Sequence, residues 1–531
     1  MVLPMPTEPN AGLDQNLEQE VRDLLVSGII STDPEARSAL SHDLFFWDNI
    51  TLPAMVVAPV SSDEVAGVLR LAQRHSRTVY VRGGGMSYTN AYGPTQSDSI
   101  LIDLTKLNRI RDVDVTNRFI VVEAGCTWRD VVEALRPHNM VVDFPAPLSG
   151  SHSTVGGAIS QNVPGGMQGV LGLEVALADG SLLKTGAWSS TVNDKPFYRN
   201  YGPDLTGLFI GDSGVFGVKT AVSLHIKAKP RGVAFGSFSY ESYEDMAETM
   251  IELAPMDFIS RRTGLDPFET ANISKVGMGD AIKALSGAVA EEASLGAGLK
   301  SAAKLAVGGT NFLDGVKWSL HLKTEGASAR AAEDGLDVAR QACLKRGREL
   351  PPILPRARDA VGFSIRKFLG KDGERWVATS ALWPIGRAVE IATKCQGFFT
   401  QRQEKMEALH ISHSYITNFS PYYFLCEPCL YWPDELSNLH LDNVSAVEAK
   451  KFKTFKANPE VRDYVRQIRE ELRDYFQSLG SIHVQIGGFY QFSDVIQPEA
   501  LTALSGIKDV FDPKGILNKG KLDSLSGQDM E

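Results

Sequence analysis

The stretch that decides the fold is Arg82-Gly83-Gly84-Gly85-Met86-Ser87, a glycine run directly after the apolar segment Thr78-Val79-Tyr80-Val81. The apolar segment has the composition of a β-strand. Glycines lack a Cβ, so consecutive backbone N–H groups in such a run can converge on an anion such as a pyrophosphate. The motif is not a Rossmann fingerprint, because the loop continues through Tyr88 and Asn90 instead of opening a helix. Taken alone, it is equally consistent with a tight turn.

Three further glycine-bearing motifs follow in order, and their recurrence indicates a cofactor-binding domain more strongly than any single motif does. The patterns around them are those of an α+β domain. Ser61-x-x-Glu64 caps a helix, Asp179-Gly180 supplies a hairpin turn, and residues 218 to 226 alternate like a half-buried strand. The motifs are Ser153-Thr154-Val155-Gly156-Gly157-Ala158-Ile159-Ser160-Gln161-Asn162, Gly172 to Gly180, and Asp204 to Val218.

Length and composition exclude several classes of protein. A chain of 531 residues exceeds one ordinary core, and 43% hydrophobic with 22% charged residues is globular. A net charge of −10 disfavours nucleic acid or an anionic membrane surface as the main partner. Five scattered cysteines suit a reducing compartment, so we expect a cytoplasmic protein. The sequence shows neither a signal peptide nor an apolar run long enough to span a membrane.

The second half of the chain has a different pattern. After Pro230 the glycine pairs disappear, and strand-like and helix-like stretches alternate on a longer repeat. This alternation predicts a second α+β domain built on an antiparallel sheet. Asn458-Pro459 begins an amphipathic helix that ends at Gly480. Beyond it, we expect a strand through His483 and Tyr490.

Together the motifs resemble the FAD-binding domain of the vanillyl-alcohol oxidase and para-cresol methylhydroxylase (PCMH) flavoprotein superfamily. The stretch Phe511 to Leu522 resembles the C-terminal segment of its FAD-linked oxidases. The resemblance implies a two-part, PCMH-type FAD-binding domain formed by residues 51–229 and by a returning C-terminal segment, 481–531. Residues 230–480 would form a cap over the isoalloxazine, and residues 1–50 an N-terminal extension.

The resemblance also implies a set of cofactor-binding residues. In this family the first glycine loop and the Thr-Val-Gly-Gly segment hold the pyrophosphate and the flavin edge through main-chain N–H groups. The residues implied are Arg82, Gly83, Gly84, Gly85, Met86, Ser87, Pro147, Ser149, Gly150, Ser151, Thr154, Val155, Gly156, Gly157, Ser160, Asn162, Gly214, Gly217, Val218 and Asn518.

The sequence departs from its relatives where FAD is attached covalently. Many members use a histidine of the first glycine loop, but this chain has Met86 there, and a thioether cannot replace an imidazole. Phenol-oxidising relatives can use a histidine of the cap instead, and the nearest equivalent stretch, Thr379 to Pro384, has none. We therefore expect non-covalent FAD.

Three residues are candidates for catalysis. His152 stands where some relatives have a flavin-linking cysteine, and it could act as a base, as an orienting donor or as a loop-stabilising hydrogen bonder. Tyr490 resembles the tyrosine of a Tyr-Arg pair in phenol-oxidising relatives, with Gln491 in place of the arginine, and its alternative role is a core tyrosine. His483 completes the set, although on a regular strand it would face away from Tyr490.

No metal site is expected. The 2-hydroxyacid dehydrogenases of the superfamily carry Gly-Ser-Ile-x-x-Glu-His-Gly, and here Gln485 and Ile486 stand at the Glu and His positions. Their upstream His-x-Asp-Gly segment does not occur in the chain. Cys426-Glu427-Pro428-Cys429 has no second pair and predicts two core thiols, and the pair His410 and His413 has no nearby carboxylate cluster.

These patterns favour an FAD-dependent oxidoreductase that oxidises an alcohol, which could be aromatic, by hydride transfer to flavin N5. A D-lactate or glycolate type 2-hydroxyacid dehydrogenase is the alternative. A flavin-binding protein without turnover is the alternative of another class. The implied partners are a small-molecule substrate and an electron acceptor, which could be dioxygen, a quinone or an electron-transfer protein. Association into a homo-oligomer is compatible with the sequence.

Overall fold

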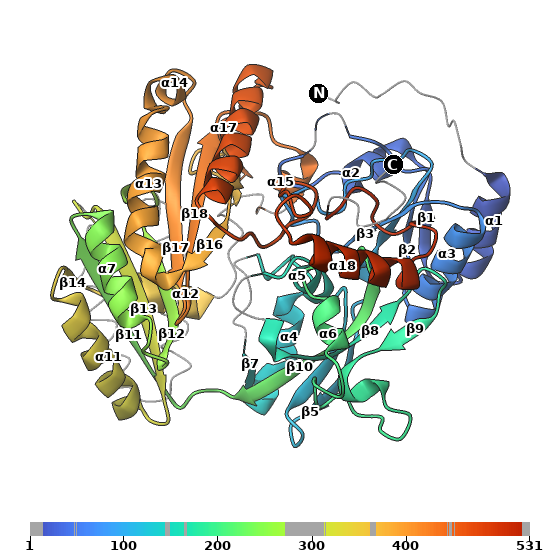
Figure 1. Ribbon diagram of the computed structural model, residues 1–531, viewed down its shortest axis with the longest axis horizontal. Coiled ribbons are helices and arrows are strands. Elements are labelled where there is room, and N and C mark those ends of the chain that lie inside the picture. Colours follow the sequence, from blue (N-terminus) through green and yellow to red (C-terminus); the bar gives the residue numbers. More distant parts are fainter. Residues whose placement is uncertain are drawn as a thin grey trace. The chain divides into compact units, whose positions relative to one another are not determined.

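The computed structural model describes residues 14–522 except 47, 49, 144–148, 164–166, 271–312, 314, 362–367, 443, 445–448 and 451. The chain forms two compact units (Figure 1). The first unit comprises residues 1–229, 437–443 and 484–531, and the second comprises residues 230–436 and 444–483. The α+β architecture expected from the sequence is confirmed.

The first unit contains a four-stranded sheet around the first glycine loop. Strands β2, β4 and β3 are parallel, and β1 pairs with β2 in the antiparallel sense. Part of the expected N-terminal extension therefore belongs to this sheet. Helix α3 begins where Ser61 accepts the N–H of Glu64 at 3.2 Å. The elements are α1 (Gln15–Leu24), β1 (Ile29–Ser31), β2 (Met55–Ala58), α3 (Ser62–Arg74), β3 (Val79–Arg82) and β4 (Ile100–Asp103).

A six-stranded antiparallel sheet completes the first unit. Its order is β5-β6-β10-β8-β9, with β7 also paired to β10. The hairpin predicted at Asp179-Gly180 joins β8 to β9, and Gly180 adopts a φ of 79°. The elements are β5 (Ile110–Asp114), β6 (Phe119–Glu123), α4 (Trp128–Leu135), β7 (Met140–Val142), α5 (Val155–Ser160), β8 (Val170–Ala176), β9 (Leu182–Lys184), α6 (Leu205–Leu208) and β10 (Val218–Ala228).

The C-terminal segment returns to this unit through α18 (Pro498–Phe511) and the turn that follows it. Asp512 is buried and accepts the N–H groups of Ile516 and Leu517 at 2.9 and 2.8 Å. The next strand-like residue, Leu517, bridges to Val79 of β3. The end of the described chain is thus built into the strand that leads to the first glycine loop.

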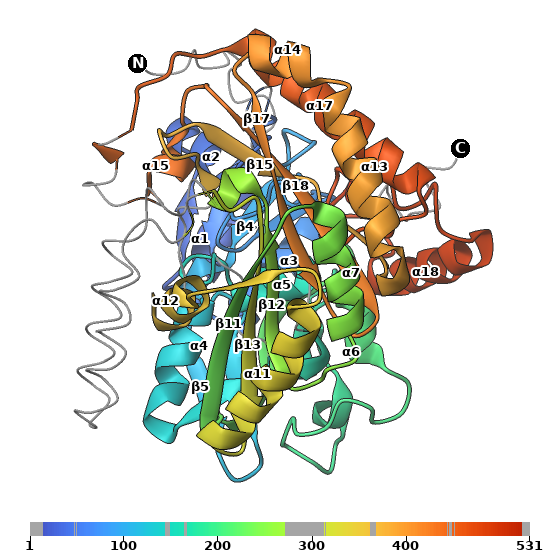
Figure 2. The same cartoon turned by 90° about the vertical axis from the view of Figure 1, so that its left-hand side faces the viewer.

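The second unit is an eight-stranded antiparallel sheet with helices on it. The strand order is β14-β11-β13-β12-β17-β18-β15, with β16 paired to β18. Helices α7, α11 and α13 lie over one face of the sheet (Figure 2). The elements are β11 (Gly232–Tyr240), α7 (Tyr243–Leu253), β12 (Ile259–Leu265), β13 (Trp318–Gly326), α11 (Ala329–Cys343), β14 (Arg348–Leu350), α12 (Ile353–Val361), β15 (Arg375–Ala378), β16 (Ala381–Pro384), α13 (Ala388–Thr400), β17 (Ser412–Phe419), β18 (Tyr423–Trp432) and α17 (Pro459–Ser478).

The face under these helices is the apolar core of the second unit. The ring of Tyr243 stacks on Trp318 with centroids 4.2 Å apart, and His413 stacks on Phe399 at 4.4 Å. All five cysteines are buried thiols outside any disulfide, and four of them lie in this unit, which agrees with core thiols at Cys426 and Cys429. Burial lowers the pKa of His413 to about 4, so this histidine is a neutral core residue.

One predicted strand does not form. The segment through His483 and Tyr490 is irregular apart from a bridge of Ile482 to Leu382, and Gln485 has a φ of 58°. The left-handed residue at Gln485 ends any extended run there. His483 belongs to the second unit and Tyr490 to the first, so alternation along a strand does not relate them.

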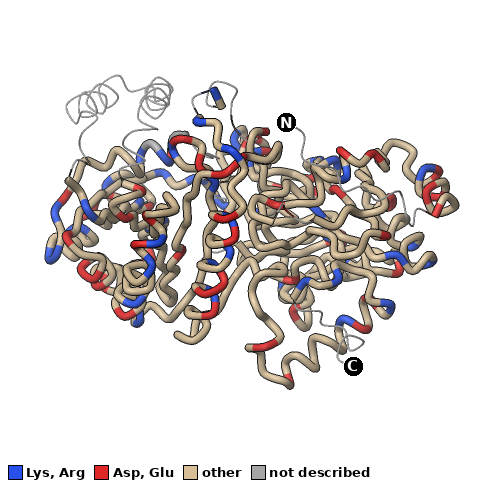
Figure 3. Tube along the Cα trace, turned by 90° about the horizontal axis from the view of Figure 1, so that it is seen from above, with Lys and Arg blue, Asp and Glu red and all other residues tan. Residues whose placement is uncertain are grey.

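Charges are mixed along both units, with blue and red residues interspersed in Figure 3. Helix α17, for example, carries Arg466 paired with Asp463 at 3.0 Å. Within the ranges that the structure describes, no helix is both long and apolar enough to cross a membrane.

Candidate cofactor-binding site

The first glycine loop lies directly against the second glycine motif. A Cβ at Gly84 would overlap the carbonyl oxygen of His152, and a Cβ at Gly83 would overlap Oγ1 of Thr154. Glycine is therefore required at both positions for the two loops to pack. The sequence motifs suggested a requirement for phosphate approach, and the structure adds contact between the loops themselves as a cause.

The second motif is fixed to the end of β6. Thr154 caps the short helix α5 and accepts the N–H of Gly157 at 3.3 Å. The N–H of Gly156 donates to the carbonyl of Ala124 at 2.9 Å, and a Cβ at Gly156 would lie only 2.7 Å from that of Ala124. The backbone of this motif consequently has little freedom to move.

The motif that precedes β10 joins the same place. The N–H of Ser213 donates to Ser160 at 2.8 Å, and Ser213 and Gly214 have φ values of 48° and 75°. Asn518 connects this turn to the first loop, because its Nδ2 donates to the Ser213 carbonyl at 2.6 Å while its Oδ1 accepts the N–H of Val81 at 3.0 Å. Asn518 thus positions two loops.

The segment around Tyr490 completes the arrangement. Backbone N–H groups of Gln485 and Gly488 donate to the carbonyls of Gln161 and Thr89, both at 2.9 Å. The N–H of Gly487 lies 3.2 Å from Oγ of Ser213. Four segments that are far apart in sequence are therefore connected by backbone hydrogen bonds in the first unit.

Several buried polar atoms at these loops have no hydrogen-bond partner among the residues that the structure describes, which is the condition expected of a ligand site. They fit a cofactor with both anionic and hydrogen-bonding groups, since Arg82 and Ser153 can donate and Gln161 can accept. The guanidinium of Arg82 also donates to the Gly83 carbonyl at 3.0 Å. The unpartnered atoms are Nε of Arg82, Oγ of Ser153, Oε1 of Gln161 and Oδ2 of Asp212.

Other predicted binding residues have structural partners. The carbonyl of Ser149 accepts the N–H groups of His152 and Ser153 at 2.8 Å each, and Oγ of Ser151 accepts from Arg129 at 2.5 Å. Gly217 packs against Val175, whose Cγ1 a Cβ would overlap. Pro147 lies outside the described residues.

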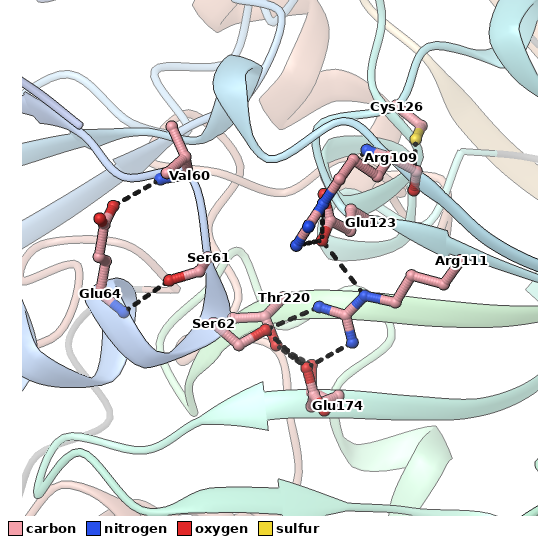
Figure 4. Close-up of polar contacts among 10 residues, drawn as sticks. All are labelled: Val60, Ser61, Ser62, Glu64, Arg109, Arg111, Glu123, Cys126, Glu174 and Thr220. Atoms are coloured by element: carbon pink, nitrogen blue, oxygen red, sulfur yellow. Dashed lines mark hydrogen bonds and ion pairs between the residues drawn. The ribbon is translucent and has the colours of Figure 1, made fainter. Parts of the chain in front are cut away.

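Glu174 of the third motif, Gly172 to Gly180, is the centre of a polar network (Figure 4). Glu174 accepts from Ser62 at 2.7 Å, from Thr220 at 2.9 Å and from Arg111 at 3.0 Å. Burial alone would raise the pKa of Glu174, but the Ser62 hydrogen bond and the Arg111 charge lower it. This network connects the start of α3 to the six-stranded sheet, so the motif has an evident structural role.

The same network contains a fully buried carboxylate that the motifs did not reveal. Glu123 accepts from the side chain of Arg109 at 2.8 Å and from Arg111 at 3.3 Å, and its side chain has no exposed surface. The sequence did contain one indication of this ion pair: Arg109 and Arg111 precede a strand that ends in a glutamate.

The candidate catalytic residues lie in different surroundings. The half-buried ring of His152 makes no hydrogen bond that the described residues show, and burial together with the charge of Arg129 lowers its pKa. Tyr490 is 2% exposed and lies beside Phe489, with ring centroids 4.9 Å apart. Burial lowers the pKa of His483 to about 4, and its Nδ1 donates to the Ser380 carbonyl at 2.9 Å.

Lys521 is a further residue that the motifs did not single out. It is 1% exposed, and its Nζ donates to Oδ1 of Asn90 at 3.2 Å and to the carbonyl of Gly93 at 2.8 Å. Burial lowers its pKa to about 8, although the nearby charge of Asp43 opposes the shift. Lys521 thus fixes the far end of the first glycine loop.

Comparison with known proteins agrees with this geometry. Residues 53–186 match the FAD binding domain family, and residues 492–522 match the C-terminal domain of FAD linked oxidases. The solved structure of p-cresol methylhydroxylase with substrate bound superposes with a TM-score of 0.72 at 16% identity, over 97% of this chain and 98% of that one. The chain therefore has the PCMH-type fold. Its two matched stretches, 53–186 and 492–522, correspond to an FAD binding domain and to the C-terminal domain of FAD linked oxidases, which confirms the resemblance drawn from its motifs.

Two curated relatives match part of the chain. The glycolate oxidase subunit GlcD of Bacillus subtilis is 28% identical over 251 residues, which is 44% of this chain and 51% of the relative. The D-lactate dehydrogenase of Archaeoglobus fulgidus is 28% identical over 209 residues, which is 38% of this chain and 44% of the relative. The matches thus span about half the length of these relatives.

Proposed function

We propose that this protein is an FAD-dependent oxidoreductase that oxidises the CH–OH group of a D-2-hydroxyacid. The observation that carries the proposal is the convergence of four glycine-bearing segments with unpartnered buried polar atoms, in a chain related to a glycolate oxidase subunit and a D-lactate dehydrogenase. The relatives favour this substrate class over the aromatic alcohol that the sequence motifs favoured.

The residues of the chain have separate tasks in this proposal. Bound FAD supplies the hydride acceptor. The loops at Gly83 to Ser87 and Thr154 to Asn162 hold it through backbone N–H groups. His152 takes the hydroxyl proton, because its lowered pKa keeps the imidazole neutral at the pH where it must accept one. Tyr490 orients the substrate oxygen, since an ordinary tyrosine pKa near 10 makes it a poor base.

The proposal assigns the proton to a side chain because the metal-ligand pattern of the hydroxyacid dehydrogenases is altered here. Gln485 and Ile486 replace the Glu and His of that pattern, and the backbone N–H of Gln485 donates a hydrogen bond to the carbonyl of Gln161. Among the residues that the structure describes, no group of three or more His, Cys, Asp or Glu side chains could hold a metal ion.

The cofactor is held without a covalent bond in this proposal, because Met86 takes the place of the attaching histidine. Acid precipitation of the yellow protein should release all flavin into the supernatant. Flavin that stays with the precipitate would show a covalent bond and would direct attention to His152 or to a residue of the second unit.

The function is tested by anaerobic titration of the purified protein with D- and L-2-hydroxyacids, aromatic alcohols and 4-alkylphenols, followed by the flavin absorbance. Bleaching by D-2-hydroxyacids at the lowest concentrations is the expected result. Bleaching by phenols or aromatic alcohols alone would overturn the proposal in favour of the activity suggested by the fold match to p-cresol methylhydroxylase. A yellow protein that no substrate bleaches would indicate flavin binding without turnover.

The electron acceptor is tested in the same preparation. The reduced protein is mixed with dioxygen, with a soluble quinone and with an electron-transfer protein, and the return of flavin absorbance is timed. The fastest acceptor distinguishes an oxidase from a dehydrogenase.

A further inference from the structure

The C-terminal segment contacts the cofactor-binding loops through a buried ammonium group. Lys508 lies in the last turn of α18 and is 5% exposed. Its Nζ donates to the carboxylate of Asp512 at 2.5 Å, to the carbonyl of Val215 at 2.7 Å and to the carbonyl of Leu517 at 3.2 Å. An ammonium group has three N–H donors, so these acceptors use all of them.

The acceptors of Lys508 belong to two segments of the site. Val215 lies in residues 211–217, the turn before β10 that contains Ser213, here called the Ser213 turn. Leu517 directly precedes Asn518, whose side chain donates to the carbonyl of Ser213 at 2.6 Å and accepts the N–H of Val81 at 3.0 Å. Lys508 therefore binds the same two segments that the side chain of Asn518 joins.

The contact of Asn518 with the Ser213 turn leaves little room for displacement. A Cβ at Gly214 would lie 2.4 Å from Nδ2 of Asn518, and Gly214 has a φ of 75°. The backbone N–H of Asn518 donates to the carbonyl of Val79 on β3 at 2.8 Å. A side-chain amide confined in this way joins the two segments only while the backbone on either side keeps its position.

The charge of Lys508 is balanced by buried carboxylates of the first unit. Asp512 has no exposed side-chain surface, and the charge of Asp212 in the Ser213 turn also acts on Lys508. Asp212 forms an ion pair with Lys219 and accepts the N–H of Gly214 at 2.9 Å. Burial lowers the pKa of Lys508, and the two carboxylates oppose this shift. Removing one partner of such a cluster leaves a buried charge uncompensated, which is costly.

An apolar contact supports the same junction. The ring of Phe511, at the end of α18, stacks on Phe209 with centroids 5.5 Å apart and meets Phe216 edge-on at 6.4 Å. Phe209 and Phe216 belong to the motif from Asp204 to Val218. Polar and apolar contacts of the end of α18 thus converge on that motif.

We propose that Lys508 is a positioning residue for the cofactor: it aligns Asn518 with the Ser213 turn, and FAD is retained tightly only in the aligned state. The inference requires FAD binding but not a particular substrate class, so it goes beyond the proposed function and is tested separately from it. When only a fraction of the protein is aligned, the apparent affinity for FAD falls by that fraction. Lys508 controls cofactor affinity in this way through protein contacts alone.

The test compares Lys508→Met with Lys514→Met as a matched control. Lys514 lies in the same segment, is exposed and donates to the carbonyl of Gln73 on α3 at 3.0 Å. The full-length apoprotein is titrated with FAD, and the dissociation constant is read from flavin fluorescence. Lys508→Met should raise it about 100-fold, which corresponds to an aligned fraction of about 1%. Lys514→Met should change it by about 2-fold at most, as is usual for surface substitutions.

A double-mutant cycle with Asn518→Ala distinguishes positioning from a general loss of stability. Asn518→Ala removes the link itself and should raise the dissociation constant at least as much as Lys508→Met does. If Lys508 acts through Asn518, the double variant should bind FAD within about 3-fold of Asn518→Ala, whereas independent effects would multiply. Lys508→Arg keeps the charge in a larger group and should show a smaller rise, about 10-fold. It replaces Lys508→Met in the cycle if that variant fails to fold.

Hydrogen exchange supplies a measurement that does not require release of the flavin. Lys508→Met should speed the exchange of backbone N–H groups in residues 512–518 and 211–217, because both segments open together when the alignment is lost. Exchange in β13 of the second unit should not change. In the wild-type protein FAD should slow exchange in the same two segments, since coupling between alignment and binding is reciprocal.

The outcomes separate this inference from the proposed function. An unchanged dissociation constant in both Lys508 variants would overturn it, and so would equal losses in Lys508→Met and Lys514→Met or effects that multiply in the double variant. Bleaching by aromatic alcohols alone would overturn the hydroxyacid proposal and leave the role of Lys508 intact. A wild-type protein that binds no FAD would overturn both.

Discussion

The glycine loops of the first unit and the sheet of the second unit differ in which atoms carry their chemistry. In the loops, backbone groups bind and pack, so Gly83 and Gly84 are required because any Cβ would overlap a neighbouring segment. On the sheet, side chains such as those of Ser237, His321 and Thr263 carry the polar groups, and they stand at paired positions of neighbouring strands. A requirement on the backbone leaves a pattern that a single sequence reveals, whereas a requirement on one sheet face leaves almost none.

The comparison predicts that the loops tolerate substitution far less than an open position of the second unit does, such as Gly397 on helix α13. Gly84→Val should abolish FAD retention in the purified protein, because the branched side chain would overlap the carbonyl of His152. The measurement is the ratio of flavin to protein absorbance after gel filtration. Gly397→Ala is the control, since no heavy atom lies within 4 Å of the added Cβ, and it should retain full flavin. Normal flavin content in Gly84→Val would mean that the loop contact is dispensable.

A smaller effect is expected where a side chain of the loops acts in chemistry. His152→Ala should keep FAD and slow anaerobic flavin reduction by about 10²–10⁴-fold, the usual range for a positioned proton acceptor. Because the pKa of His152 is lowered, the wild-type rate should stay constant down to its ordinary value of 6.5 and fall only below it. In His152→Ala, the reduction rate should no longer show this fall at low pH.

His483→Ala is the control for that experiment. Its Nδ1 is committed to the carbonyl of Ser380, and it belongs to the other unit. A loss in His483→Ala as large as that in His152→Ala would transfer the role of base to the second unit. Tyr490→Phe should slow reduction without altering the pH profile.

The smallest effect concerns stability. Glu174→Gln should lower the free energy of unfolding by about 2–3 kcal/mol, because Arg111 loses a charged partner in a largely buried network. The folded pKa of Glu174 lies below its ordinary value, so its contribution is present above that value and is lost as pH falls through the lowered one. The difference between variant and wild type in urea unfolding should therefore shrink in acid.

An exposed ion pair provides the control for Glu174. Arg330→Gln removes a pair with Asp334 whose side chains are 91% and 69% exposed. Exposed pairs contribute little, about 0–1 kcal/mol. A similar loss of unfolding free energy in both variants would show that the network around Glu174 stabilises the fold no more than an exposed ion pair does.

The sequence predicted the fold class and the loops because both depend on local rules. Ser61 begins a helix as its capping pattern indicates, and Asn458 does so before a proline. The expected strand through His483 and Tyr490 was wrong because Gln485 adopts a left-handed conformation, with a backbone hydrogen bond to the distant Gln161. That contact depends on tertiary neighbours.

The site was predictable only in part, because its contacts also join segments that are distant in sequence. The glycines and Asn518 were identifiable by resemblance, but the role of Asn518 as a connector of two loops appears only when Val81 and Ser213 are adjacent.

The hydrogen bond from the N–H of Val81 to the side chain of Asn518 can form only late in the synthesis of the chain. The two residues are 437 positions apart. At the usual elongation rates of about 5–20 residues per second, a ribosome needs about 20–90 s to pass from one to the other. Until Asn518 is made, the nascent first unit therefore lacks the link between its first glycine loop and the turn at Ser213, and the second unit, which ends at His483, can complete its sheet first. Cofactor loading should accordingly be a late step, and chains stalled before Asn518 should remain colourless.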